Sequence, residues 1–147
     1  MITLVFVCAG NKCRSPAAQT VFAKMAKDAK RSVDFTVKSA GTYAKGAGQP
    51  ADWRMTKAAA LRGYTISGLA RRIDSTDIYN ADLIVTMDAK NTAYVTDMLP
   101  KNSVFKIAGV EPLCSVDVPD PYTGDEKTFN SVLDQIEKGC AELLQRI

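Results

Sequence analysis

The N-terminal segment ITLVFV, residues 2–7, restricts the possible folds of this chain more than any other feature. A short run of β-branched and apolar residues is typical of a strand that is buried on both faces of a parallel sheet. The segment CAGNKCR follows as a loop, and Ser15 and Pro16 then suit the N-cap and first position of a helix that extends to about Lys30. The chain therefore begins with a strand, a loop and a helix.

The rest of the chain repeats this alternation. We expect further strands at residues 33–42, 83–87 and 104–107, and helices at residues 52–61, from Asp88 to before Pro100, and along the apolar face that runs from Phe129 to Ile147. Alternating strands and helices favour right-handed crossovers and a parallel sheet. The sequence predicts an α/β fold: a single domain, residues 1–147, with a four-stranded parallel sheet of order 2-1-3-4 and helices on both faces.

Composition limits the classes of partner. A chain of 147 residues with 46% hydrophobic content has the size of one domain with its own core. Lys and Arg number 19 against 16 Asp and Glu, and this scattered net charge of +3 gives no reason to expect a nucleic acid or a membrane surface as partner. The apolar N-terminus lacks a charged lead-in and is too short for a signal peptide, so we expect a cytoplasmic protein, monomeric or weakly dimeric.

Cysteine and histidine usage limits the chemistry. Without a secretory signal, the four cysteines are expected to be free thiols: Cys8, Cys13, Cys114 and Cys140. The sequence has no CxxC pair and no histidine, which argues against a zinc site, and we expect no metal and no cofactor. Catalysis by Ser-His-Asp or Cys-His is excluded, so a nucleophile here needs another source of activation.

The loop from Cys8 to Arg14 has the composition of an anion site. Ligands of such folds bind beyond the carboxyl ends of the strands, where this loop lies. A loop before a helix N-terminus can direct several N–H groups into one concavity, and the helix dipole adds positive potential. Such surroundings lower the pKa of a cysteine from about 8.5 to roughly 3.5–7.5. Cys8, as the last residue of the strand, is therefore expected to react as a thiolate.

The other loop residues fit the same chemistry. Arg14 can bind two oxygens of a tetrahedral oxyanion, and Gly10 lets the backbone approach the ligand closely. Asn11 tolerates a left-handed conformation and can lock the loop through its amide, while Ser15 could donate to the Cys8 sulfur. The predicted substrate-binding residues are Ala9, Gly10, Asn11, Lys12, Cys13, Ser15 and Tyr122. Cys-x5-Arg alone also fits a buried cysteine with a surface arginine; the preceding strand, the Gly-Asn pair and the Ser-Pro helix start favour the phosphate loop.

A departing alkoxide or phenoxide needs a proton, and the loop contains no acid. Asp120 is the best candidate for this acid. It lies in the long irregular segment 109–125, between two prolines that hold it in an extended conformation suited to directing its carboxyl group at the site. A turn-forming Asp-Pro pair on a solvated loop is the alternative interpretation.

With these residues the chain resembles the low-molecular-weight protein tyrosine phosphatases. The likeness spans nearly all of the sequence and includes VFVCAGNKCRSPAAQ (5–19), VKSAGT (37–42), MDAKN (87–91) and DPYTG (120–124). The resemblance implies that Cys8 is the nucleophile, that Arg14 binds phosphate and stabilises the transition state, and that Asp120 is general acid and then general base. It also implies a cysteinyl-phosphate intermediate, tyrosine-phosphorylated proteins as substrates, and a reversible Cys8–Cys13 disulfide; Cys13 could instead be a small buried apolar residue.

The chain departs from the family pattern at four positions. Ala9 and Lys12 replace bulky apolar residues, Thr123 replaces a second tyrosine, and Gly68 stands where a histidine is common. Something else must therefore support the loop asparagine. We expect Tyr122 to line the pocket wall, Ser39 to support the loop, and Asp52 and Arg54 to cap or brace a helix. The candidates for the rim are Tyr43, Lys45 and Trp53.

Other activities of this loop remain open. An arsenate reductase would need further cysteines to carry away the oxidising equivalent, and TMDAKNTAYVTDM, after the third strand, has none. A phosphoprotein-binding module would not need Asp120, and Arg14 is not expected in a phosphocysteine carrier.

Overall fold

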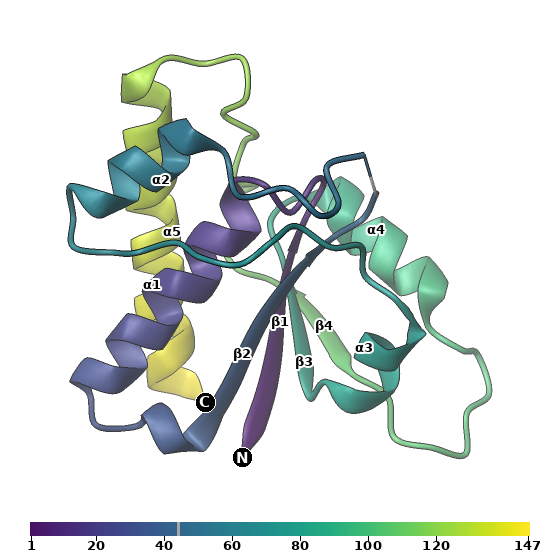
Figure 1. The fold of residues 1–147 in the computed structure, drawn as a ribbon. Helices are drawn as coiled ribbons and strands as arrows, with labels where there is room; N and C mark the ends of the chain where they lie inside the picture. The colour runs from purple at the N-terminus through teal and green to yellow at the C-terminus, as the bar shows by residue number, and fades with distance from the viewer. Residues whose placement is uncertain (44) are drawn as a thin grey trace.

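The computed structural model describes residues 1–43 and 45–147 and shows an α/β fold around one parallel sheet (Figure 1). All neighbouring strands pair in parallel in the order β2-β1-β3-β4, which confirms the predicted sheet. The strands are β1 (Ile2–Cys8), β2 (Phe35–Gly41), β3 (Leu83–Thr86) and β4 (Gly109–Pro112). The helices are α1 (Arg14–Asp28), α2 (Trp53–Ala60), α3 (Ser75–Asn80), α4 (Ala89–Met98) and α5 (Glu126–Arg146), with a 3-10 turn η1 (Ser32–Asp34) before β2.

Helices cover both faces of the sheet, as expected from the doubly buried pattern of β1. Helices α1, α2 and α5 lie on one side and α3 and α4 on the other (Figure 1). Leu4 and Phe6 of β1 belong to the core cluster under α1 and α5, whereas Val5 and Val7 belong to a second cluster with residues of α3 and α4. Because consecutive side chains of a strand point to opposite faces, a continuous apolar run fills both cores.

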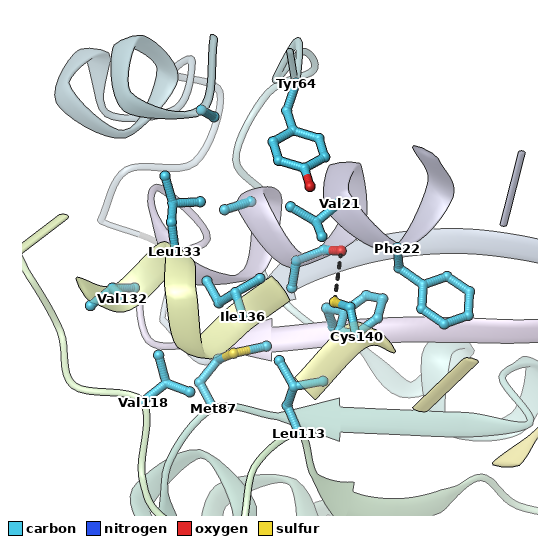
Figure 2. Packing of buried hydrophobic residues seen from close by; sticks show 14 of the residues in the cluster. Val21, Phe22, Tyr64, Met87, Leu113, Val118, Val132, Leu133, Ile136 and Cys140 are labelled. Carbon is cyan, nitrogen blue, oxygen red and sulfur yellow. Dashed lines mark hydrogen bonds between the residues drawn. The ribbon is translucent and has the colours of Figure 1, made fainter. Parts of the chain in front are cut away.

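The larger core is closed by the C-terminal helix. Figure 2 shows Ile136 and Cys140 of α5 packed near Val21 and Phe22 of α1. The Cys140 thiol donates a hydrogen bond to the Ala18 carbonyl oxygen at 3.7 Å. Among the described residues, no helix combines the length and apolarity that crossing a bilayer requires.

The predicted fourth strand and the predicted N-cap of the first helix are wrong. Residues 104–107 form no strand, and Val104 and Phe105 are 94% and 71% exposed; the fourth strand is β4, whose residue Gly109 lies opposite Leu83 of β3. Ser15 does not cap α1, because the helix begins at Arg14 with Cys13 at the N-cap position. The Ser15 hydroxyl is buried among loop residues and bonds to them instead.

The predictions for the helix starts at Asp52 and Asp88 are confirmed. Asp52 accepts a hydrogen bond from the Arg54 N–H and caps α2, and Asp88 accepts one from the Asn91 N–H and caps α4. Such caps satisfy backbone donors that have no partner in the first turn of a helix. At the start of β2, η1 occupies the first residues of the predicted strand, which begins only at Phe35.

Candidate active site

The loop between β1 and α1 lies at the carboxyl edge of the sheet, where β2 approaches it closely. The Thr42 N–H donates to the Ala9 carbonyl oxygen at 2.8 Å and to that of Cys8 at 3.0 Å. A Cβ on Gly41 would lie 2.7 Å from the Ala9 oxygen and 2.8 Å from the Asn11 nitrogen. Only glycine at position 41 allows this approach, which fixes the loop against the end of β2.

Asn11 fixes the loop from the other side. It has a φ of 54°, in the left-handed region, and is 3% exposed. Its Nδ2 donates to Ser15 Oγ at 2.8 Å and to Ser39 Oγ at 3.0 Å, while its Oδ1 accepts from the Arg71 N–H at 3.0 Å. Ser39 therefore supports the loop, as expected. With Gly68 in place of a histidine, two hydroxyls and one backbone amide hold this side chain.

Cys8 lies at the floor of the site, 2% exposed, with its Sγ 3.0 Å from Ser15 Oγ. Asn11 already donates to Ser15 Oγ, so the Ser15 hydroxyl hydrogen can be directed at the sulfur. The competing acceptor, the Ala40 carbonyl oxygen, is farther away at 3.3 Å. Asn11, Ser15 and Cys8 thus form one chain of hydrogen bonds that ends at the sulfur.

Arg14 is held rigidly at the start of α1. Its Nη1 donates to Asp88 Oδ2 at 2.7 Å and to the Val118 carbonyl oxygen at 2.9 Å, and its Nη2 lies 3.9 Å from Asp120 Oδ2. Burial acts to lower the pKa of Arg14, but the hydrogen bond to Asp88 and the charges of Cys8, Asp88 and Asp120 outweigh it and raise that pKa. Because both Nη1 hydrogens are used, the guanidinium has one fixed orientation.

Sequence reasoning missed this second function of Asp88. Its Oδ1 caps α4 while its Oδ2 binds Arg14, so one carboxylate joins the helix start to the arginine. The available signal was the position of Asp88 just after the third expected strand, beside the loop in a parallel sheet.

The DPY segment lies at the open side of the site. Asp120 is half exposed, and its Oδ1 accepts from the Tyr122 N–H at 3.1 Å. Arg54 donates to the Tyr122 carbonyl oxygen at 2.9 Å, and its guanidinium lies 5.4 Å from the centre of the Tyr122 ring. Asp52 in turn binds Arg54 through both carboxylate oxygens. This pair braces α2, as expected, and also ties the Asp120 segment to that helix.

A pocket of about 420 Å³ brings most of the predicted residues together. It is lined by Cys8, Gly10, Lys12, Cys13, Arg14, Asp120 and Tyr122, and by the rim candidates Tyr43 and Lys45. Of the other predicted binding residues, Asn11 and Ser15 do not line the pocket and instead hold the loop, and the Ala9 carbonyl oxygen accepts hydrogen bonds from the N–H groups of Thr42 and Tyr43, just after β2. Trp53 lies outside this pocket, at a separate groove.

Two residues of the loop have surroundings that distinguish them. Lys12 donates from Nζ to Gln49 Oε1 at 3.0 Å, which places a positive charge at the pocket mouth. Burial, and after it the negative charges of Cys8, Asp52 and Asp120, raise the pKa of the Cys13 thiol far above its usual range. Cys13 is therefore a neutral thiol beside Cys8, and all four cysteines are free, as predicted.

Comparisons with known proteins agree with this geometry. The family model described as low molecular weight phosphotyrosine protein phosphatase matches residues 3–147. A putative low molecular weight protein-tyrosine-phosphatase of Synechocystis is 34% identical, over 96% of this chain and 93% of the relative. The low molecular weight phosphotyrosine protein phosphatase of Homo sapiens is also 34% identical, over 98% and 94%. The crystal structure of a protein tyrosine phosphatase from Entamoeba histolytica matches with a TM-score of 0.93 and 35% identity, over 99% of this chain and 96% of that one. The chain therefore belongs to the low molecular weight phosphotyrosine protein phosphatase family.

Proposed function

We propose that this protein hydrolyses phosphotyrosine monoesters of protein substrates through a cysteinyl-phosphate intermediate on Cys8. The observation that carries the proposal is that Cys8, Arg14 and Asp120 line one pocket, with the Ser15 hydroxyl oxygen 3.0 Å from the Cys8 sulfur. A nucleophile, an oxyanion ligand and an acid are the three groups that phosphoryl transfer to a side chain requires.

In the first step, the Cys8 thiolate attacks phosphorus in line with the ester bond. An S–P bond forms, the P–O bond to the aryl group breaks, and the Asp120 carboxyl group donates its proton to the departing oxygen. The loop N–H groups and the Arg14 guanidinium bind the equatorial oxygens of the phosphoryl group while charge redistributes over them. Because Asp88 fixes the guanidinium, Arg14 needs no reorientation at this moment.

In the second step, the Asp120 carboxylate takes a proton from a water molecule, which attacks phosphorus from the side the phenol has left. The S–P bond breaks, inorganic phosphate forms, and the sulfur leaves as a thiolate. The Ser15 hydroxyl, 3.0 Å from Sγ, stabilises that leaving sulfur. Asp120 is then protonated again and ready for the next substrate.

The pocket favours a tyrosine ester over a serine ester. Cys8 lies at the floor and is almost completely buried, so the ester oxygen must be carried inward on a long side chain. The rings of Tyr43 and Tyr122 line the walls and can pack against a phenyl ring. A phosphoserine backbone would meet the rim before its phosphorus reached Sγ.

The rival activities lack the groups they need. An arsenate reductase must transfer its oxidising equivalent through further thiols to the outside of the site. Cys13 lines the pocket beside Cys8, but Cys140 is buried in the core and Cys114 does not line the pocket, so neither can take the equivalent from a Cys8–Cys13 pair. A carrier or binding module would have no use for Asp120 within reach of Arg14.

Turnover of 4-nitrophenyl phosphate and of phosphopeptides tests the proposal. We expect catalytic phosphate release, abolished in Cys8→Ser and lowered about 10²- to 10⁴-fold in kcat in Asp120→Asn, with aryl phosphates of poorer leaving groups affected most. Cys114→Ser, which changes a thiol outside the pocket, is the matched control and should keep wild-type kcat. Stoichiometric labelling of Cys8 without turnover, or equal turnover of phosphoserine and phosphotyrosine peptides, would contradict the proposal.

A further inference from the structure

A second depression, of about 170 Å³, lies between α2 and the segment that leads into α5. We call it the α2 groove, bounded by Trp53 and Leu61 on α2 and by Gly124 and Asp125 on the opposite side. Phe129 forms its floor and is 1% exposed, whereas Trp53 and Leu61 at its edge are 72% and 74% exposed. The groove thus has an apolar floor and two large apolar side chains at the edge.

The groove shares a wall with the active-site pocket. The Arg54 guanidinium lies 5.4 Å from the centre of the Tyr122 ring, which lines the pocket, and 4.7 Å from the centre of the Phe129 ring, which lines the groove. The same segment supplies Asp120 and Tyr122 to the pocket and Gly124 to the groove. One guanidinium therefore separates the two depressions, and a ligand of the pocket can extend into the groove.

Size and charge indicate what the groove can hold. Its volume is below the range of about 300–1,000 Å³ typical of small-molecule sites, so it suits a single side chain rather than a separate ligand. Arg54 and Lys57 line it on one side and Asp125 and Glu126 on the other, so neither sign of charge prevails. The apolar floor and the exposed tryptophan favour an apolar occupant, because Trp is among the residues that most often dominate binding energy.

We propose that the α2 groove is a specificity subsite of the substrate protein and takes an apolar side chain two residues from the phosphotyrosine. The proposal rests on the proposed function. In an extended peptide, residues i and i+2 point to the same side and lie about 7 Å apart. A phosphotyrosine seated beside Tyr122 therefore presents the side chain two positions away to the adjoining groove.

Phosphopeptides with leucine or alanine at position −2 or +2 test this inference in the intact protein. At one of the two positions, we expect leucine to raise kcat/KM about fivefold to tenfold over alanine, since burial of about half of the additional leucine carbons gives an effect of this size. Trp53→Ala and Leu61→Ala should each reduce that preference to less than twofold. Leu69→Ala removes a leucine that is 65% exposed and outside the groove, so this matched control should keep the preference.

Turnover of 4-nitrophenyl phosphate distinguishes a failure of the subsite from a failure of the proposed function. This substrate is too small to reach the groove, so its kcat/KM should be the same in wild type, Trp53→Ala and Leu61→Ala. If wild type hydrolyses it yet does not distinguish leucine from alanine at either position, the subsite is refuted and the proposed function stands. If wild type fails to hydrolyse it, the proposed function is refuted, and the subsite, which rests on that function, is refuted as well. If Trp53→Ala changes the sedimentation coefficient but not peptide preference, the groove is a contact between copies of the chain, which also refutes the subsite.

Discussion

Replacing Asn11 with alanine removes the support of the phosphate loop. The effect can be measured both as a loss of unfolding free energy and as a loss of catalytic rate. The Asn11 side chain makes three hydrogen bonds, to Ser15, Ser39 and the Arg71 N–H, and all are largely shielded from water. Alanine removes all three and leaves the Arg71 N–H without this acceptor. Alanine also adopts a φ of 54° less readily than asparagine does, so the substitution strains the backbone at this position.

The expected loss of unfolding free energy is about 4 kcal/mol. Each intramolecular hydrogen bond contributes about 0.5–1.5 kcal/mol, so the three bonds supply about 3 kcal/mol. The left-handed backbone costs an ordinary residue roughly 1–2 kcal/mol, and asparagine somewhat less, which adds about 1 kcal/mol. For a domain of this size, about 4 kcal/mol lowers the melting temperature by roughly 8–16 °C. Urea unfolding and calorimetry measure both quantities.

Two further substitutions at the same position separate the causes. Asn11→Gly loses the same hydrogen bonds without the Cβ penalty, so it should be more stable than Asn11→Ala. Asn11→Asp keeps an acceptor for Arg71 but cannot donate to Ser15, and its charge opposes the Cys8 thiolate. Its kcat on 4-nitrophenyl phosphate should therefore fall furthest, by about 10²-fold, a loss in the range found for one preorganised donor. An alanine variant within about 1 kcal/mol of wild type, or a glycine variant less stable than alanine, would refute this account of the loop.

Three shorter predictions concern other contacts. Asp88→Asn keeps a cap for α4 but leaves buried Arg14 without its countercharge, so kcat should fall about 10²-fold; an unchanged kcat would show that Asp88 only caps the helix. Gly41→Ala forces a Cβ against the loop backbone and should lower the unfolding free energy by about 1–3 kcal/mol in urea titrations, and an effect near zero would contradict it. Burial and the hydrogen bond to Glu137 raise the pKa of Tyr64 from 10.0 to about 12, so the unfolded chain ionises first and stability should fall as pH rises from 10 to 12. Urea titrations at pH 9 and 11 should show this loss in wild type and less of it in Tyr64→Phe.

The fold and the loop were predictable because both depend on neighbours in sequence. The apolar run of β1, the Cys8–Arg14 spacing and the helix after it are local patterns, and each is present in the structure. β4 was not predictable, because its residues GVEP include glycine and proline, which are typical of turns. Its position follows from pairing with β3, whereas the more strand-like Val104 and Phe105 find no partner and stay exposed.

Contacts between distant segments account for the rest of what the sequence missed. Arg14 and Asp88 are 74 positions apart, and Arg54 and Tyr122 are 68 apart, so no local pattern connects them. Ser15 shows the same limit at short range. Its place before a proline is typical of an N-cap, but the buried loop offers its hydroxyl stronger partners in Cys8 and Asn11.

In the proposed mechanism Asp120 is an acid in one step and a base in the next, and we propose that the sharing of Arg14 among several anions accounts for this change. Without substrate, Asp120 Oδ2 lies 3.9 Å from Arg14 Nη2. A phosphoryl dianion that binds Nη2 competes for this partner and places two negative charges beside Asp120, and this favours the protonated carboxyl that the first step needs. Phosphate binding should therefore take up more protons in wild type than in Asp120→Asn, as calorimetry in buffers of different ionisation enthalpy can measure. Equal uptake in the two proteins would mean that Asp120 obtains its proton without help from the substrate.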